Sequence, residues 1–455
     1  MNPSELKDQK VVVMGFARSG IAVAKRLASA GAKVVITESR PRDCFDVDNL
    51  EKMDSLGVRL EFGGHSAGVL KGACLLVLSP GVHLDSPVVR SAGELGIPVV
   101  SEIEIAFSMI SCPVIAVTGT NGKTTTCVLI GEMLARAGFK TAVAGNIGHP
   151  LSAVDDCGLD FIVAEVSSYQ LETIKAFRPR VSVILNITED HLERHGSMEA
   201  YASAKSRIFL NQKGEDYFVY NSDDPRVKGL VSSCPARRIP FSRKGPAEGG
   251  VFARSGALVS CIGGIESKII EAGNIGIRGE HNLENALGAC ACALVSGAKP
   301  SAVAEVLREF EGVEHRIEFV RALEGVEFFN DSKATNPDSS IVAMRTLGNG
   351  IVLIAGGRDK GGDLSSMVRE SRGRIKGLVL IGEAADRFEK AFSSEKGVRI
   401  ARAKGMPEAV RKSFDLAGRG DRVLLSPACS SFDMFRDYED RGLAFKRAVS
   451  ELRGK

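Results

Sequence analysis

Residues 113–126 contain the side-chain types and the spacing needed to bind the phosphate groups of a nucleotide. The residues concerned are Gly119, Thr120, Asn121, Gly122, Lys123, Thr124 and Thr125. In such a loop, glycines let backbone N–H groups turn toward phosphate oxygens, a lysine contacts the β- and γ-phosphates, and a hydroxyl binds Mg²⁺. The sequence therefore predicts an ATP site in which Lys123 and Thr124 carry the phosphate and metal contacts.

This loop is predicted to connect a buried strand to a helix. Residues 113–118 form a short apolar run, and residues 127–138 carry apolar side chains at helical spacing. One position departs from the standard pattern, since Val117 stands where a glycine is expected five positions before Gly122. An ordinary glycine-containing turn between strand and helix is the alternative interpretation.

Further polar residues follow apolar runs in the same region. Glu165 ends one run, and Glu189, Asp190 and His191 come after the next. Because parallel strands present their carboxyl ends at one edge of a sheet, these groups are expected near the phosphate loop. Glu165 is a candidate Mg²⁺-side carboxylate, and His191 is a candidate metal ligand or acid/base group, although a single histidine is often structural. Lys205, on a helix predicted from about Met198, would by itself be interpreted as solvated surface.

The first hundred residues open with a βαβ pattern. Residues 10–14 and 33–37 are predicted strands, residues 15–20 form a glycine-rich turn, and Glu38 ends the second strand. This pattern is typical of dinucleotide sites. Ala17 replaces the second glycine, where a pyrophosphate needs close backbone approach, so another nucleotide diphosphate or a structural turn remains an alternative.

The last third of the chain is again predicted to alternate strands and helices. Four predicted strands end in Lys, Asp, Ser or Thr residues, which indicates a face that binds carboxylates or phosphates. Between the two regions, Asn282 and Asn285 stand one helical turn apart at the start of an apolar helix. Their amides either cap that helix or bind an adenine edge.

Composition sets the broad class. The chain has 455 residues, 44% of them hydrophobic and 25% charged, as in ordinary globular proteins of two or three domains. A net charge of +3 without a basic block argues against nucleic acid as a partner. No apolar run approaches membrane-spanning length, the polar start does not resemble a signal peptide, and the 10 cysteines lack paired spacing. We therefore expect a cytoplasmic protein with reduced thiols and no membrane insertion.

The expected fold is α/β with three domains. Residues 1–101 are predicted to form a Rossmann-like domain, and residues 102–299 a central ATP-binding domain that resembles P-loop ATPases and has a mostly parallel sheet. Residues 300–455 are predicted to form a second Rossmann-like domain.

Taken together, the motifs resemble those of the ATP-dependent Mur ligases, which add amino acids to a UDP-linked peptidoglycan precursor. The motifs, in the family's order, are the loop 119–125, Glu165, the segment 189–191, the segment 279–285, His315 with Arg316, and the segment 330–336. Residues 426–435 and 438–442 are most similar to the members that add D-glutamate. The resemblance covers nearly the whole chain, and folylpolyglutamate synthetases are more distant relatives of this family.

The resemblance implies that residues 1–101 form a UDP-sugar-binding domain and residues 300–455 an amino-acid-binding domain, and it implies roles for individual residues. Those expected to contact UDP-N-acetylmuramoyl-L-alanine are Arg18, Ser19, Glu38, Ser39, Arg40, Ser79 and Asn146. Those expected around ATP, besides loop residues 119–125, are Asn282, Asn285, Arg316 and Asp331. Those expected to hold D-glutamate are Lys333, Thr335, Lys360, Ser431 and Tyr438. The expected catalytic residues are Lys123, Glu165, His191 and Lys205, and the expected ligands of two Mg²⁺ ions are Thr124, Glu165, His191 and Lys205.

Lys205 matches the lysine that the family carries as a CO₂-derived carbamate, which would make it an anionic ligand of Mg²⁺. The implied reaction is phosphoryl transfer from ATP to a carboxylate, followed by attack of an amine on the acyl phosphate, in a monomeric enzyme. Three alternatives remain at this stage: a nicotinamide-dependent dehydrogenase, a non-catalytic nucleotide switch, and a related ligase that adds a different amino acid.

Overall fold

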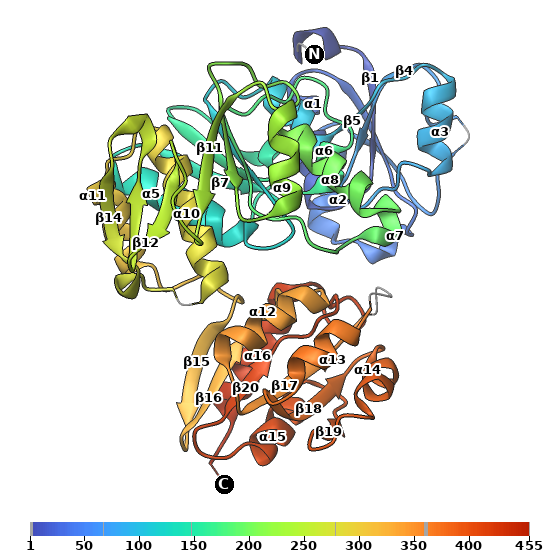
Figure 1. Cartoon of the computed structure of the whole chain (residues 1–455). Helices are drawn as coiled ribbons and strands as arrows, with labels where there is room; N and C mark the ends of the chain where they lie inside the picture. Colours follow the sequence, from blue (N-terminus) through green and yellow to red (C-terminus); the bar gives the residue numbers. More distant parts are fainter. Residues whose placement is uncertain (1–2, 67, 147, 278, 359–362, 455) are drawn as a thin grey trace. The chain divides into compact units, whose positions relative to one another are not determined.

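The computed structural model describes residues 3–66, 68–146, 148–277, 279–358 and 363–454. Its strands form three β-sheets (Figure 1). The chain divides into two compact units. The first holds residues 1–187, 191–275 and 283–309, and the second holds residues 188–190, 276–282 and 310–455. The expected α/β fold is confirmed, with two sheets in the first unit and one in the second.

The first sheet has five parallel strands in the order β3-β2-β1-β4-β5. Its strands are β1 (Lys10–Met14), β2 (Lys33–Thr37), β3 (Arg59–Glu61), β4 (Ala73–Leu78) and β5 (Val99–Ser101). The helices are α1 (Arg18–Ser29), α2 (Val47–Ser55), α3 (Pro87–Glu94) and α4 (Glu102–Ser108). The strand order reverses beside β1, so the turns after β1 and β4 meet at the position where open α/β sheets bind ligands.

The second sheet has nine strands in the order β14-β13-β12-β11-β10-β9-β6-β8-β7. The strands are β6 (Val114–Thr118), β7 (Thr141–Gly145), β8 (Phe161–Glu165), β9 (Val181–Ile184), β10 (Tyr217–Asn221), β11 (Arg237–Ser242), β12 (Val251–Arg254), β13 (Ala257–Ser260) and β14 (Ser267–Glu271). Pairings from β7 through β12 are parallel, whereas β13 pairs antiparallel with β12 and β14. Strand β6 is buried along its whole length, as expected for a central strand covered on both faces.

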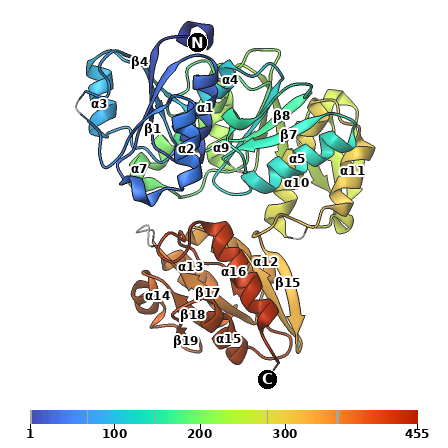
Figure 2. The same ribbon diagram turned by 180° about the vertical axis from the view of Figure 1, so that it is seen from behind.

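Helices complete the first unit. They are α5 (Lys123–Arg136), α6 (Ser168–Leu171), α7 (Leu192–His195), α8 (Met198–Ser206), α9 (Pro225–Leu230), α10 (Glu280–Val295) and α11 (Pro300–Glu309). The first residues of α10 are grouped with the second unit. Helices α5 and α11 lie side by side in both views (Figures 1 and 2). Arg136 of α5 contacts Glu305 and Glu309 of α11, which attaches α11 to the first unit rather than to the C-terminal one.

The second unit contains a six-stranded sheet in the order β15-β16-β20-β17-β18-β19. The strands are β15 (Glu318–Leu323), β16 (Val326–Asn330), β17 (Ile351–Gly356), β18 (Ile375–Ile381), β19 (Arg399–Arg402) and β20 (Arg422–Leu425). Its helices are α12 (Pro337–Leu347), α13 (Ser365–Ser371), α14 (Ala385–Phe392), α15 (Met406–Leu416) and α16 (Tyr438–Glu451). All pairings are parallel except β15 with β16. The loops after β16, β20 and β17 therefore open at the same edge.

Candidate active site

The phosphate loop joins β6 to α5 and needs both of its glycines. Gly119 has φ +156° and Gly122 has φ +85°, the latter in the left-handed region. A Cβ on Gly122 would lie 2.0 Å from Oδ1 of Asn285, so a side chain there would collide with the amide of α10. The loop thus runs as a bare backbone cradle into the N-terminus of α5, where N–H groups and the helix dipole favour anions.

Lys123 is the first residue of α5, and its ammonium turns back over the loop. Its Nζ donates hydrogen bonds to the carbonyl oxygens of Gly119 at 3.0 Å and Thr120 at 2.8 Å. The loop is held from the other side by Asn186, whose Oδ1 accepts from the backbone N–H groups of Thr120 and Asn121 at 3.1 and 2.9 Å. Sequence reasoning gave Asn186 no role, although its place directly after an apolar strand was a usable signal.

A cluster of hard oxygen atoms stands beside the loop. The Thr124 hydroxyl donates to Oε2 of Glu165 at 2.7 Å, and the Asn146 amide donates to Oε1 at 3.0 Å. Glu165 is only 2% exposed. A hydroxyl and a buried carboxylate at a phosphate cradle are the ligand chemistry that Mg²⁺ prefers, so the residues present fit the expected ion.

Lys205 lies inside the protein, at 1% exposure, and not on the solvated surface that its sequence context suggests. Its Nζ donates to the carbonyl oxygen of Gly119 at 2.8 Å and stands 4.5 Å from the ring centroid of Tyr201. The Tyr201 hydroxyl in turn lies 3.3 Å from Oγ1 of Thr120. Helix α8 thereby brings a buried amine against the phosphate loop.

His191 precedes α7 with φ +55°, and its ring packs edge-on against Tyr169 with centroids 4.9 Å apart. Behind it, the buried Arg194 stacks on Tyr169 at 4.0 Å and forms an ion pair with Glu172 at 2.6 Å. His195 contacts the Ser168 hydroxyl at 3.0 Å through Nε2, and burial lowers its pKa. Sequence reasoning missed both Arg194 and His195.

The turn after β1 forms a second cradle at the first sheet. A Cβ on Gly20 would lie 2.0 Å from the Gly15 carbonyl oxygen, so only glycine allows this close turn. The Ser79 hydroxyl, after β4, donates to that carbonyl at 3.4 Å. Arg18 and Ser19 begin α1 directly after the turn. The turns after β1 and β4 therefore meet, as the strand order requires.

Glu38 organises the other side of this cradle. Its carboxylate accepts from the backbone N–H of Phe16 at 2.9 Å, from that of Arg40 at 3.1 Å and from the Arg40 guanidinium. Burial alone would raise the pKa of Glu38, but these hydrogen bonds outweigh it and hold the pKa at about 2. The Ser39 hydroxyl lies 3.3 Å from the same carboxylate. Glu38 is therefore ionised at neutral pH, with Arg40 beside it.

A small pocket opens between the two sheets of the first unit. Its walls include Ser79 and Pro80 of the turn after β4, and Tyr169, Gln170, Thr173 and Arg194 of the central region. The Arg194 guanidinium also donates to the Pro80 carbonyl at 3.3 Å. Ser79, an expected UDP-sugar residue, thus lines one pocket together with residues of the central region.

In the second unit, Asp331 lies in the loop after β16 and is 1% exposed. It accepts from the Ser426 hydroxyl at 2.8 Å and from the Ile317 N–H at 3.3 Å. Burial raises its pKa to about 6, against the charge of Arg316, which lowers it. Desolvation of the half-buried His281 and the charge of Arg316 lower the pKa of this histidine to about 4. Among the described residues, no hydrogen-bond partner is found for the buried Nε2 of His281 or for the buried Nε of Arg316.

The residues expected to hold D-glutamate also belong to the second unit. The Lys333 ammonium lies 3.5 Å from the Tyr438 hydroxyl and 5.0 Å from its ring centroid. Ser431 follows β20 and is 2% exposed, and Thr335 is half-buried after β16. Lys360 lies outside the described residues. Asn282 is grouped with this unit, whereas Asn285 is in the first unit at the phosphate loop.

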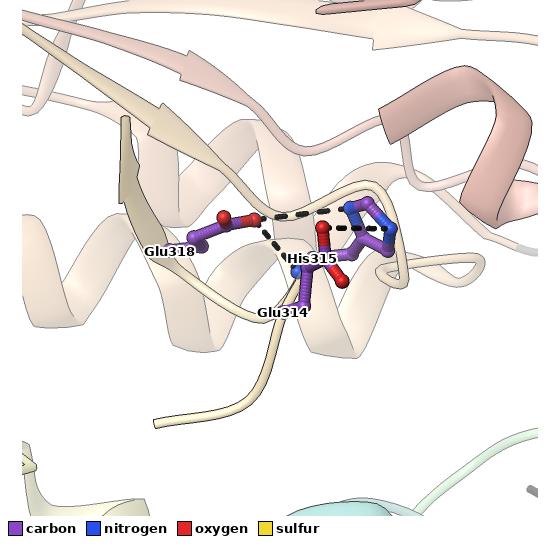
Figure 3. Close-up of side chains that lie close together, drawn as sticks. All are labelled: Glu314, His315 and Glu318. Atoms are coloured by element: carbon purple, nitrogen blue, oxygen red, sulfur yellow. Dashed lines mark hydrogen bonds and ion pairs between the residues drawn. The ribbon is translucent and has the colours of Figure 1, made fainter. Parts of the chain in front are cut away.

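One group of carboxylates and histidine in the described part of the chain is close enough to share a metal ion (Figure 3). It consists of Glu314, His315 and Glu318, whose candidate ligand atoms lie within 4.8 Å of one another. The Lys446 ammonium already contacts both carboxylates, and Asn330 Nδ2 lies 2.8 Å from Nδ1 of His315. The Lys446 ammonium therefore balances the charge of these carboxylates. The cluster of Glu314, His315 and Glu318 holds the turn before β15 in position.

Family models match three successive parts of the chain. The MurD-like N-terminal domain of Mur ligases matches residues 9–101, the Mur ligase middle domain matches residues 117–293, and the Mur ligase glutamate ligase domain matches residues 315–429. These matches follow the three β-sheets in order.

Relatives align over the whole length. A UDP-N-acetylmuramoylalanine–D-glutamate ligase from Thermoanaerobacter sp. (strain X514) is 47% identical, with 99% of this chain and 100% of the relative covered. A ligase of the same name from Caldanaerobacter subterraneus is 46% identical over 99% of this chain and 100% of its own. Among solved structures, a MurC from Thermotoga maritima has a TM-score of 0.60 at 20% identity and covers 97% of this chain and 98% of its own. A MurF from Acinetobacter baumannii has a TM-score of 0.61 at 18% identity, with 99% and 93% covered, so these structures share the fold.

The family models, the relatives and the phosphate loop before α5 together identify an ATP-dependent ligase. The chain belongs to the Mur ligase family. This membership confirms the resemblance found in the motifs, and it excludes the dehydrogenase and the non-catalytic switch as descriptions of the chain.

Proposed function

We propose that this protein joins D-glutamate to UDP-N-acetylmuramoyl-L-alanine in peptidoglycan precursor synthesis, with conversion of ATP to ADP and phosphate. Whole-length identity of 47% to ligases named for this reaction supports the substrate pair. The observation that carries the chemistry is the contact of Thr124 with Glu165 beside a glycine cradle, because it puts a hard-oxygen pair at the phosphate loop.

The roles within the phosphate site follow from position and charge. Lys123 moves from the loop carbonyls to the β- and γ-phosphates when ATP binds, since an ammonium gains more from phosphate oxygens than from neutral carbonyls. Thr124, Glu165, His191 and Lys205 would hold two Mg²⁺ ions, and bound Mg²⁺ would neutralise negative charge on the phosphates. Asn186 keeps the loop amides in place, so the L-alanyl carboxylate meets a preorganised, positive surface.

Lys205 acts as a carbamate in this proposal. Its neutral amine forms a new N–C bond to CO₂ and releases a proton, which converts a cation into an anionic oxygen ligand. Burial at 1% exposure beside the loop supports this, because an ammonium in that position would repel a metal ion. The resulting charge reversal lets α8 contribute to metal binding.

Different parts of the chain would bind the three substrates. The cradle of Gly15, Gly20 and Ser79, with Glu38 and Arg40 at its side, holds the UDP-sugar. Arg18, Ser19, Ser39 and Asn146 complete that set. Asn282, Asn285, Arg316 and Asp331 serve the nucleoside of ATP. Lys333, Thr335, Ser431, Tyr438 and Lys360 hold D-glutamate, whose amine attacks the acyl phosphate.

We expect a cytoplasmic monomer. In the part of the chain that the structure describes, no helix has both the length and the apolar character needed to cross a membrane. All ten cysteines are free thiols, and five of them are buried. Burial strongly raises the pKa values of two of these, Cys290 and Cys292.

Phosphate release with a panel of amino acids tests the proposed function. UDP-N-acetylmuramoyl-L-alanine, ATP and Mg²⁺ are held constant, and D-glutamate, L-glutamate, L-alanine and meso-diaminopimelate are compared. We expect release with D-glutamate at least about 10³-fold faster than with the others, because buried polar groups left unpaired reject wrong substrates on this scale or above it. Release only with another amino acid would replace the substrate while keeping the ligase class.

A further inference from the structure

Arg441, on the first turn of α16, is the largest fully buried side chain among the described residues, at 0% exposure. Its guanidinium makes three hydrogen bonds. Nε donates to Oγ of Ser332 at 3.0 Å, and one terminal nitrogen donates to the carbonyl oxygen of Ser332 at 2.8 Å. The other donates to the carbonyl oxygen of Cys429 at 3.0 Å.

These bonds connect loops that are far apart in the sequence. Ser332 lies in the loop after β16, and Cys429 lies in the loop after β20, the neighbouring strand in the sheet. Gly357, after the next strand, β17, completes the arrangement, since a Cβ there would lie 3.2 Å from the Arg441 guanidinium and 2.4 Å from the Ser430 carbonyl. One side chain therefore joins the loops after β16 and β20 by hydrogen bonds and packs against the loop after β17.

The surrounding residues leave the positive charge without a direct counterion. All three acceptors are neutral oxygens, and no carboxylate of the described residues lies within ion-pair distance of this guanidinium. Asp331 and Asp433 act on it only from farther away. Burial lowers the pKa of Arg441 to about 10, so the group stays charged at neutral pH. A buried charge without a partner is costly, and such a charge needs a reason to be there.

The candidate amino-acid residues lie next to these anchor points. Lys333 follows Ser332, Ser431 comes two positions after Cys429, and Tyr438 stands one helical turn before Arg441. The Ser332 hydroxyl also donates to the Tyr438 carbonyl at 2.8 Å, which ties the start of α16 to the same point. A change at Arg441 would thus alter the distances among Lys333, Ser431 and Tyr438 together.

We propose that Arg441 is a positioning residue for the amino-acid substrate: it fixes the relative positions of Lys333, Ser431 and Tyr438, and its charge makes their pocket electropositive. This inference rests on the proposed function, in which that substrate is the dicarboxylate D-glutamate. The planar fork of arginine reaches two carbonyls and a hydroxyl at once, whereas lysine offers a single ammonium and cannot hold the three groups in one plane.

The test compares Arg441→Lys with Arg447→Lys, an exposed arginine on the same helix. Both changes keep the charge and the helix. For Arg441→Lys we expect the KM for D-glutamate to rise by about tenfold or more, because small displacements of substrate-positioning groups cost up to on the order of 10²-fold. The KM values for ATP and for the UDP-linked substrate should stay within about twofold, since neither the phosphate loop nor the first sheet is touched. Arg447→Lys should match the unmodified protein in the KM values for D-glutamate, for ATP and for the UDP-linked substrate.

A purely structural role for Arg441 predicts a different result, namely a lower unfolding temperature and less folded enzyme with an unchanged KM for D-glutamate. That outcome would overturn the proposal. If Arg441→Lys does not fold, Ser332→Ala removes one acceptor of the fork and its link to Tyr438, and should raise the same KM by about threefold or more, the scale of one hydrogen bond. An unchanged KM in Ser332→Ala would likewise count against it. Should the unmodified protein use another amino acid, the proposed function fails first, and the same KM comparison is made with that amino acid.

Discussion

The phosphate loop and the proposed amino-acid pocket each lie against one fully buried basic side chain, and the two side chains are held in different ways. Lys205 is 1% exposed and donates to the Gly119 carbonyl beside the Tyr201 ring. Arg441 is 0% exposed and uses a planar fork to bind two carbonyls and a hydroxyl. Lysine can lose its proton and react with CO₂, whereas arginine keeps its charge at any physiological pH.

This difference separates two uses of a buried positive charge. Near a metal-binding cluster, a residue that can exchange its cation for an anionic carbamate is useful, because Thr124 and Glu165 supply few negative charges by themselves. In a pocket for a dicarboxylate, a charge that cannot be lost is useful. In the proposed mechanism, the chemistry of each ligand would therefore favour lysine on α8 and arginine on α16.

The largest effect is expected for Lys123→Ala, which removes the mobile cation of the phosphate loop. Turnover at saturating ATP should fall by about 10³-fold or more, the scale on which charges at a transferred phosphoryl group act. The unfolding temperature should change little, since the hydrogen bonds from Lys123 to the carbonyl oxygens of Gly119 and Thr120 join residues of one loop. ADP formation and thermal unfolding measure the two quantities, with the exposed Lys140→Ala as control. Near-normal turnover would reject the phosphate-loop assignment.

Lys205→Ala should be the next most severe change and tests the carbamate directly. We expect activity to fall by about 10²-fold or more, because one metal ligand is lost. Formate or acetate at millimolar concentration should restore part of it, since either carboxylate can enter the vacated space. Lys205→Arg should show no such rescue, because the guanidinium stays charged and fills the site. Full activity of Lys205→Ala without added carboxylate would remove the carbamate from the mechanism.

Most of the phosphate site could be predicted from the sequence because its residues are close together in the chain. Strand β6, the loop and the start of α5 form one continuous segment, so residue type and spacing were sufficient for Lys123 and Thr124. Glu165 was found by its place at a strand end. Lys205 was different, since its sequence context indicates a surface residue and only the family resemblance suggested otherwise.

The amino-acid pocket could be predicted less well because its parts come from separate strand ends. Arg441 binds residues 109 and 12 positions away, and no spacing rule connects them. Helix α11 was assigned to the third domain because the segment before Pro300 has turn residues, yet its ion pairs with Arg136 attach it to the first unit. The antiparallel strands β13 and β14 were also missed, since they are short and end in ordinary turns.

A smaller effect is expected for Gly122→Ala. The residue has φ +85°, and a Cβ would meet Oδ1 of Asn285 at 2.0 Å. We expect the Kd for ATP to rise by about tenfold and the free energy of unfolding to drop by about 1–3 kcal/mol, the cost of a strained backbone position. Gly138→Ala provides the control, because that glycine has a similar φ of +97° but open space around its Cβ. If both variants lose ATP affinity equally, the collision with Asn285 is not the cause.

The smallest effect concerns the pH dependence of stability at Asp331, in the same unit as Arg441. The ordinary pKa of this carboxyl group is 3.8, and burial raises it to about 6 in the folded protein. Between these values the folded state binds more protons than the unfolded state, so the stability that this group contributes falls as the pH rises from about 4 to 6 and stays low above that. In Asp331→Asn the titration is absent, while an amide oxygen can still accept from Ser426. We therefore expect the free energy of unfolding of this variant, relative to the unmodified protein, to improve by about 1–3 kcal/mol between pH 4 and pH 7.

Denaturant unfolding at pH 4, 5, 6 and 7 measures this difference in the free energy of unfolding. The control is Asp48→Asn, which changes an exposed carboxylate of α2 in the other unit. Asp437 is not used as a control because its side chain caps α16. If the free energies of unfolding of Asp331→Asn and the unmodified protein differ by the same amount at every pH, the Asp331 carboxyl group of the unmodified protein keeps its ordinary pKa in the folded state. In that case the charge of Arg316 and the Ser426 hydroxyl would compensate fully for burial, and Asp331 would meet the nucleoside as a carboxylate that is ionised throughout this range. If the difference in the free energy of unfolding rises with pH, the Asp331 carboxyl group of the folded protein titrates near pH 6. A nucleotide that donates hydrogen bonds to Asp331 would then favour the ionised form, so nucleotide binding would release a proton.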